Sequence, residues 1–171
     1  MPKSITRTKG PQHKMNTENL ESLVEVAGKQ AQTIILGLHQ ELMPTWVFID
    51  RDGGANIVGT PWQDEVEKKY YGFRIKRMLA ESGAIAYSFL CEAWASSAEK
   101  DWKPGQPHIE PRLDPDRREV VLAFATDGDQ IVWRHWNIIR NSAGRVTALK
   151  KVDGMHSHLS WLTQLLPKKH A

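Results

Sequence analysis

Hydrophobic and polar positions recur along the chain at two spacings, which predict where helices and strands lie. Apolar residues fall every three or four positions over residues 16–43 and again over residues 60–82, as is typical of amphipathic helices. A shorter stretch with the same spacing, residues 158–166, predicts a last helix. Alternating or short apolar runs predict five strands, over residues 45–50, 56–59, 84–95, 119–126 and 130–140.

Residues that start or stop regular structure separate these segments. Asn16 is suited to cap the first helix, and Pro44 is expected to end it. Thr60 followed three positions later by Gln63 predicts a capping box at the start of the second helix. Gly83 predicts the end of that helix.

The order of the segments predicts an α+β fold, α-β-β-α-β-β-β-α, with a hairpin and a three-stranded meander in one antiparallel sheet. We expect the helices to lie on one face of the sheet and to leave the other face partly open. Residues 16–167 then form a single domain, flanked by a disordered basic arm (1–15) and a basic tail (168–171).

Composition limits the classes of function. Of 171 residues, 40% are hydrophobic and 25% are charged, as in ordinary globular domains. No apolar run reaches the length of a membrane span, and we expect no secretory signal. The single cysteine, Cys91, alternates with core positions and is expected to be buried and inert. These features predict a cytoplasmic protein, of a bacterial cell or of the host cell if the gene is phage-borne.

The net charge of +3 belongs to the two ends of the chain. Without the six basic residues of the ends, 17 basic residues remain against 20 acidic ones. Nucleic acid is therefore expected to bind through the basic tails, if it binds at all, and a basic domain face is not predicted. The six residues are Lys3, Arg7, Lys9, Lys14, Lys168 and Lys169.

Two short motifs suggest catalytic or metal chemistry. Residues 47–53, Val-Phe-Ile-Asp-Arg-Asp-Gly, resemble the first motif of haloacid-dehalogenase-type phosphatases, which implies Asp50 as nucleophile and Asp52 as general acid with Mg²⁺. Gly54 departs from that family's pattern, and the alternative is a hairpin turn. His156 and His158 resemble the histidine pair of JAMM-type metalloproteases. The third ligand of such a site is absent, so neither a metal nor another cofactor is expected.

The strand over residues 130–140 is the main binding candidate, because one of its faces carries Arg134, Trp136 and Arg140. Interleaved Arg and Trp suit stacking on nucleic acid bases, and they also dominate protein–protein hot spots. The third alternative is packing, with Trp136 under a helix and Arg134 paired with Glu119 or Glu92 across strands.

A second candidate lies where the 96–118 segment meets a strand. Arg117 and Arg118 stand in the charged run Asp116–Glu119, and Glu92 and Trp94 are expected alongside them. The pattern Glu92-Ala93-Trp94, a proline-rich excursion and Asp114–Glu119 resembles small uncharacterised proteins of phage and bacterial accessory genes. That resemblance implies an accessory interaction protein and no catalytic residue.

The sequence thus favours a non-enzymatic protein that binds a macromolecular partner, above all another protein, through an open sheet face and the 96–118 segment. An unpaired sheet edge is compatible with a homodimer. Two alternatives remain: a Mg²⁺-dependent phosphatase or hydrolase that uses Asp50 and Asp52, and a nucleic-acid-binding protein.

Overall fold

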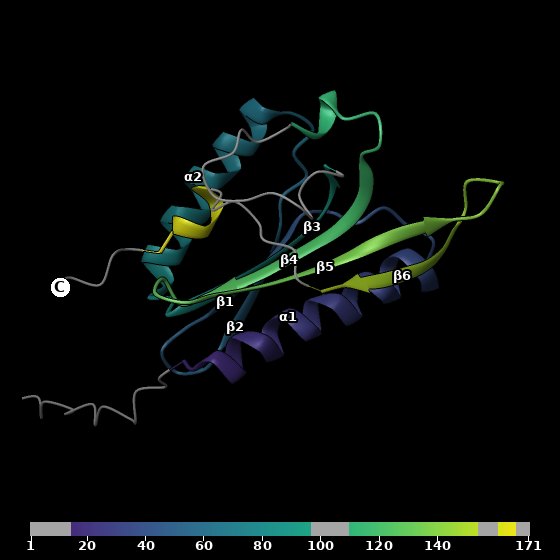
Figure 1. Ribbon diagram of the computed structural model, residues 1–171. Coiled ribbons are helices and arrows are strands. Elements are labelled where there is room, and N and C mark those ends of the chain that lie inside the picture. Colours follow the sequence, from purple (N-terminus) through teal and green to yellow (C-terminus); the bar gives the residue numbers. More distant parts are fainter. Residues whose placement is uncertain (1–14, 97–109, 154–160, 167–171) are drawn as a thin grey trace, which may run out of the picture.

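The computed structural model of the chain describes residues 15–96, 110–153 and 161–166. It confirms the α+β class (Figure 1). The elements in chain order are α1 (Thr17–Gln32) with the π-helical turn η1 (Thr33–Gly37), β1 (Thr45–Ile49), β2 (Ala55–Gly59), α2 (Glu65–Ser82), β3 (Ala86–Ala95), the 3-10 turn η3 (Pro111–Leu113), β4 (Arg118–Thr126), β5 (Ile131–Arg140), β6 (Val146–Val152) and the 3-10 helix η4 (Trp161–Gln164).

The strands form one antiparallel sheet in the order β2-β1-β3-β4-β5-β6 among the described residues. The predicted hairpin and the predicted meander are both present. Strand β6 was not predicted. It pairs with β5 through a register shift at Ile139/Arg140 and forms one edge of the sheet. Its adjacent Lys150 and Lys151 interrupt the alternation of apolar and polar positions that would have marked a strand.

The helices cover both faces of the sheet, which corrects the expected one-sided arrangement. In Figure 1, α1 lies below β3, β4 and β5, while α2 and η4 lie above the sheet. Two buried clusters result. One joins α1 to small and branched residues of the strands, such as Ala86, Val121 and Ala123. The other joins α2 and η4 to a set of aromatic side chains that includes Trp46 of β1, Phe89 of β3 and Phe124 of β4.

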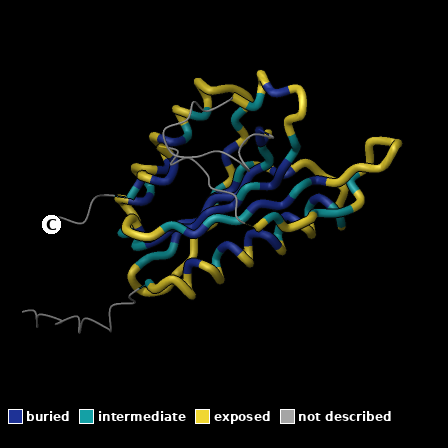
Figure 2. Tube along the Cα trace, viewed as in Figure 1, coloured by how far each residue is buried: buried dark blue, intermediate teal, exposed yellow. Residues whose placement is uncertain are grey.

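The physical reason lies in the central strands. The expected core face of β3, with Tyr87, Phe89 and Cys91, does face the aromatic cluster. The other face carries Ala86 and Leu90, which are also buried, because α1 packs against them. Figure 2 shows β3 and β4 buried along most of their length. A strand buried on both faces reads as a nearly continuous apolar run, so alternation alone did not reveal the second covered face.

The helix boundaries follow from local capping. In α1, Asn16 and Asn19 form a capping box, which confirms the predicted start, whereas the helical segment ends at η1, before Pro44. Helix α2 ends at Gly83 with a φ of 63°, as predicted. Its cap is Asp64, whose carboxylate accepts from the Glu67 amide at 2.8 Å, so the predicted Thr60 capping box is wrong.

Thr60 is buried and accepts a hydrogen bond from Trp46 Nε1 at 3.0 Å, so its hydroxyl belongs to the aromatic core. At the other end of the chain, η4 confirms part of the predicted last helix. Tyr87 Oη holds η4, donating to the Leu162 carbonyl and accepting from the Leu165 amide. Burial of this phenol raises the pKa of Tyr87 above its usual value.

The ends of the predicted domain are only partly covered by the described residues. Met15, which the sequence analysis placed in the arm, packs against the α1 cluster. The arm 1–14, the tail 168–171 and residues 97–109 lie outside the described residues. Within the described ranges, no helix has both the length and the apolar character needed to cross a membrane.

Candidate functional site

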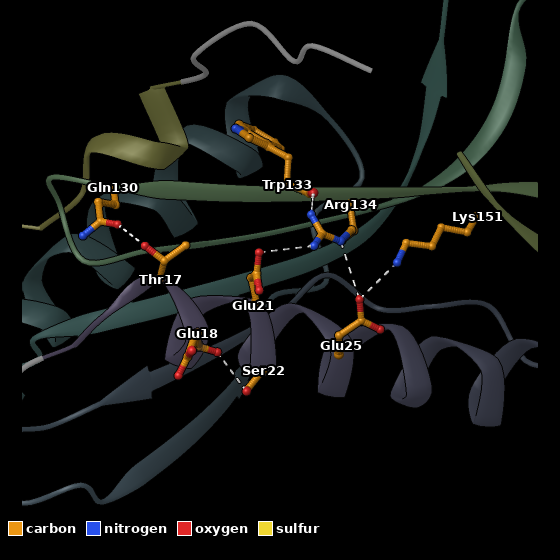
Figure 3. Close-up of polar contacts among 9 residues, drawn as sticks. All are labelled: Thr17, Glu18, Glu21, Ser22, Glu25, Gln130, Trp133, Arg134 and Lys151. Atoms are coloured by element: carbon orange, nitrogen blue, oxygen red, sulfur yellow. Dashed lines mark hydrogen bonds and ion pairs between the residues drawn. The ribbon is translucent and has the colours of Figure 1, made fainter. Parts of the chain in front are cut away.

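Two of the predicted binding residues, Arg134 and Trp136, lie beneath α1. The Trp136 side chain is 5% exposed, and its ring carbon Cζ2 lies only 2.5 Å from the place where a Cβ on Gly28 would stand. Arg134 forms ion pairs with Glu25 at 3.5 Å and Glu21 at 3.8 Å, both on α1 (Figure 3). The open face expected at these residues is therefore covered. They hold α1 on the sheet, as the packing alternative required for Trp136.

Two further polar contacts join α1 to β6 and to the β4–β5 turn. Lys151 of β6 approaches the same Glu25 carboxylate at 3.3 Å, and Thr17 donates to Gln130 at 2.6 Å (Figure 3). The predicted partners of Arg134 across the strands, Glu119 and Glu92, lie further along the sheet. The actual partners come from a helix, and strand registry alone could not indicate them.

Arg118 lies on the opposite face of the sheet, where it is the cross-strand neighbour of Ala95 and close enough for its charge to act on His135. Within the described part of the chain, Arg118 Nε and Asn137 Oδ1 are buried and have no hydrogen-bond partner. Burial, and then the positive charge of Arg118, lower the pKa of His135 to about 4. Arg118 is thus separated from the other predicted binding residues by the thickness of the sheet.

The remaining predicted residues, Glu92, Trp94, Arg117 and Arg140, do come together at one end of the sheet. Trp94 is the cross-strand neighbour of Glu119, and the side chain of Trp94 is 53% exposed. The Arg117 guanidinium lies over the Trp94 ring, 4.6 Å from the centroid. A cation–π contact of this kind at an exposed site contributes about 0.5–1 kcal/mol.

A buried carboxylate positions Arg117. Asp114 accepts from the Ser96 hydroxyl at 2.8 Å and from the Asp116 amide at 2.9 Å. The Asp114 carbonyl accepts from the Arg117 amide at 3.3 Å, which closes a turn directly before β4. Because Ser96 directly follows β3, this turn is tied to the end of the strand that carries Trp94. The backbone that carries Arg117 is therefore fixed relative to the strand that carries Trp94.

Glu119, the cross-strand neighbour of Trp94, lines a cavity of about 270 Å³ whose walls also include Glu92 and Arg140. Arg140 binds Glu119 with two hydrogen bonds, of 2.6 and 2.7 Å, and this contact raises the pKa of the guanidinium. Glu92 accepts from the Leu42 amide at 2.8 Å. We call Glu92, Trp94, Arg117, Glu119 and Arg140 the Trp94 patch.

Sequence reasoning missed the other wall of this cavity. His39 and Arg145 line it and contact each other at 2.6 Å, although 106 positions separate them in the chain. His39 has a φ of 54°, a left-handed conformation that non-glycine residues rarely adopt, and it follows the π-helical turn η1. Such irregular backbone often occurs at functional sites. No pattern in the sequence marks it.

The proposed catalytic aspartates form part of the β1–β2 turn. Asp50 Oδ1 accepts from the Asp52 amide at 2.9 Å and from the Gly54 amide at 2.7 Å, which is the turn geometry of the alternative interpretation. Asp127 serves similarly in the β4–β5 turn, accepting from the amides of Asp129 and Gln130. In the described ranges, no three His, Cys, Asp or Glu side chains are grouped so that they could hold a metal ion.

Two further candidates concern histidine and cysteine. His156 and His158 lie outside the described residues. Cys91 is buried as expected, and burial raises the pKa of its thiol to about 12, which suppresses the nucleophilic thiolate.

Comparison with family models, with curated proteins and with solved structures finds no significant match to this chain. The arrangement of the site must therefore be interpreted from its own geometry. The Trp94 patch combines an exposed aromatic face, a stacked cation and a cavity with charged walls, which suits non-covalent binding.

Proposed function

We propose that the chain is a non-enzymatic interaction protein whose Trp94 patch binds a protein partner. The observation that carries this proposal is the half-exposed Trp94 ring under Arg117, next to Glu119 in the wall of the 270 Å³ cavity. Trp and Arg are the residue types most enriched among binding hot spots.

The geometry favours binding because arginine side chains of the Trp94 patch are already partly ordered before a partner associates. The backbone amide of Arg117 is held by the Asp114 turn and its guanidinium lies over the Trp94 ring, while the Arg140 guanidinium is held by Glu119. Ordering a long side chain on association costs about 0.5–1.5 kcal/mol, and that cost is reduced where the side chain is already held. The cavity, which Glu92 and Glu119 line, can accept a side chain of the partner.

The charge of the patch supports a protein partner over nucleic acid. Two carboxylates, Glu92 and Glu119, stand among the two guanidiniums of Arg117 and Arg140, so the patch has no net positive charge. A protein surface that binds the phosphates of nucleic acid carries an excess of Lys and Arg side chains. A reducing cytoplasmic location is part of the proposal, supported by the single buried cysteine.

Site-specific cross-linking tests the proposal. A photoreactive phenylalanine analogue replaces Trp94 in one variant and Ile57 in a control variant, because Ile57 is 69% exposed on β2 and lies outside the patch. In cells of the native host, position 94 should give a discrete protein adduct that position 57 does not give. Adducts that are the same at both positions, or absent at position 94, would refute the proposal.

The captured protein then provides a direct binding assay. Trp94→Ala and Arg117→Ala should each weaken binding by about 10-fold or more, the range expected of hot-spot residues. Ile57→Ser should leave binding unchanged. Equal affinities for all variants would show that the partner recognises another surface.

A further inference from the structure

Strand β2 forms one edge of the sheet, and its hydrogen-bond pattern can be read from the two ends of its ladder with β1. At one end the Asp50 amide donates to the Gly54 carbonyl, and at the other the Thr60 amide donates to the Pro44 carbonyl. Opposed residues of an antiparallel pair alternate between hydrogen-bonded and non-hydrogen-bonded. The two end bonds therefore fix which residues of β2 bond to β1 and which do not.

Three β2 residues direct their backbone N–H and C=O groups away from β1, along the plane of the sheet. They are Ala55, Ile57 and Gly59, which alternate with the bonded positions and are exposed. Among the residues that the structure describes, none forms a hydrogen bond with these outward groups. A second β-strand presents acceptors and donors at the spacing of this row, so the row itself indicates what can cover it.

The two edges of the sheet differ in how they are protected from such pairing. Strand β6 carries the adjacent Lys150 and Lys151, and its ladder with β5 contains a register shift. Charged side chains and bulges of this kind keep an edge from pairing with another chain. Strand β2 has no charged residue, no proline and no register shift, and Ile57 at its centre is 69% exposed.

We propose that β2 pairs antiparallel with β2 of a second copy of the chain, which joins two six-stranded sheets into one. The outward-facing residues are symmetric about Ile57, so a two-fold axis at this residue uses all of them. Ile57 then lies opposite Ile57 of the partner subunit, and Ala55 lies opposite Gly59 of the partner subunit. Each such pair exchanges two backbone hydrogen bonds. The contact is isologous and closes after two copies.

The side chains of β2 favour a second copy over a strand of another protein. An edge that selects a foreign strand does so through pockets or charges for alternate side chains, and β2 itself carries no charge. Pairing a strand with itself brings like charges together wherever it is charged, which β2 avoids. The axis also brings the exposed Ile57 side chains together. Met43, 51% exposed, borders them, because its sulfur lies 2.7 Å from the Cβ position of Gly59 on the same face.

This edge is separate from the Trp94 patch. Val47 is the cross-strand neighbour of both Ile57 and Ser88, and Trp94 lies six positions beyond Ser88 on β3. A strand rises about 3.3 Å per residue, so the patch is about 20 Å further along the sheet. The dimer leaves the patch free for the protein partner proposed above.

Sedimentation of the full chain over a range of concentrations tests the dimer. Ile57→Lys should raise the dimer dissociation constant by about 10-fold or more, because the two-fold axis places lysine opposite lysine. Phe73→Ser is the control, since Phe73 is 76% exposed on α2 and lies outside this edge. A wild-type chain that stays monomeric at about 0.5 mM would overturn the proposal, as would a dimer that Ile57→Lys leaves unchanged.

Proline at position 57 tests the backbone pairing. Because the Ile57 N–H points outward, Ile57→Pro removes a donor of the dimer and none of the β1–β2 ladder. This variant should keep the melting temperature of the dilute chain while raising the dimer dissociation constant by about 10-fold or more. Ile57→Val retains the donor and should dimerise like the wild type. Equal dissociation constants for the proline and valine variants would contradict pairing through β2.

Amide hydrogen exchange locates the contact on the strand. The amides of Ala55, Ile57 and Gly59 should exchange more slowly at high protein concentration than at low concentration, because only the dimer supplies their acceptors. The amides of Asn56 and Val58, which face β1 in both states, are the internal reference. A dimer that leaves exchange at the three outward positions unchanged would place the interface elsewhere and overturn the proposal.

Discussion

Gly28→Ala tests whether α1 covers Trp136. In an exposed helix this substitution stabilises by about 1 kcal/mol, because alanine has the higher helix propensity. Here the new Cβ would lie 2.5 Å from Trp136 Cζ2 and 2.9 Å from Cη2. Carbon atoms pack best at about 3.5–4.0 Å, so α1 or the ring must move by about 1 Å. Overpacking of this kind costs about 1–3 kcal/mol.

The net effect of Gly28→Ala is therefore a loss of about 0–2 kcal/mol in the free energy of unfolding, which is about 1–3 kcal/mol below a glycine-to-alanine variant without the clash, both measured by urea denaturation. Gly37→Ala is the matched control, because no atom lies within 4 Å of its Cβ position and it belongs to the same helical segment. Combining Gly28→Ala with Trp136→Phe removes the clashing atoms and should recover part of the loss. If Gly28→Ala is as stable as Gly37→Ala, Trp136 is not covered by α1 and the sheet face is open.

Two further predictions concern buried polar groups. Because the pKa of His135 is lowered to about 4 from 6.5, the unfolded chain binds the proton more readily, and stability should fall by about 2–3 kcal/mol as pH drops from 6.5 to 4. Urea titrations at several pH values measure this slope, and a His135→Gln variant with the same slope would contradict the assignment. Thr60→Val leaves Trp46 Nε1 without its acceptor and should cost about 1–3 kcal/mol, whereas Thr60→Ser should cost less. Equal melting temperatures for the two variants would contradict the role given to the hydroxyl.

Much of the fold could be predicted because local patterns agree with it. The Arg51–Gly54 turn between two apolar runs predicted the β1–β2 hairpin, and Gly83 predicted the end of α2. Where a side chain has a non-local partner, local rules failed. Thr60 has the right spacing for a helix cap, but its hydroxyl is used by Trp46 on a neighbouring strand. Only the folded aromatic cluster reveals that competition.

In the candidate site, too, contacts that follow from local patterns could be predicted, and contacts between distant segments could not. Pairing of β3 with β4 brings Trp94 next to Glu119, so the expected proximity of Trp94 to the charged run is present in the structure. The role of α1 over Trp136 was one of three alternatives, and Gly28 was the signal that went unused. His39 and Arg145 could not be found, because they meet only when the end of the first helical segment lies against the β5–β6 turn.

The two buried clusters share the strands β3 and β4, and this has a consequence for local opening. Strands β2 and β6 form the two edges of the sheet, so within one chain each is paired with one neighbouring strand only. Their amides should therefore exchange with solvent deuterium at a low free energy of opening. The amides of β3 and β4 are screened by α1 on one side and by the aromatic cluster on the other. Detaching either helix alone leaves them protected, so their exchange requires both halves of the molecule to unfold together.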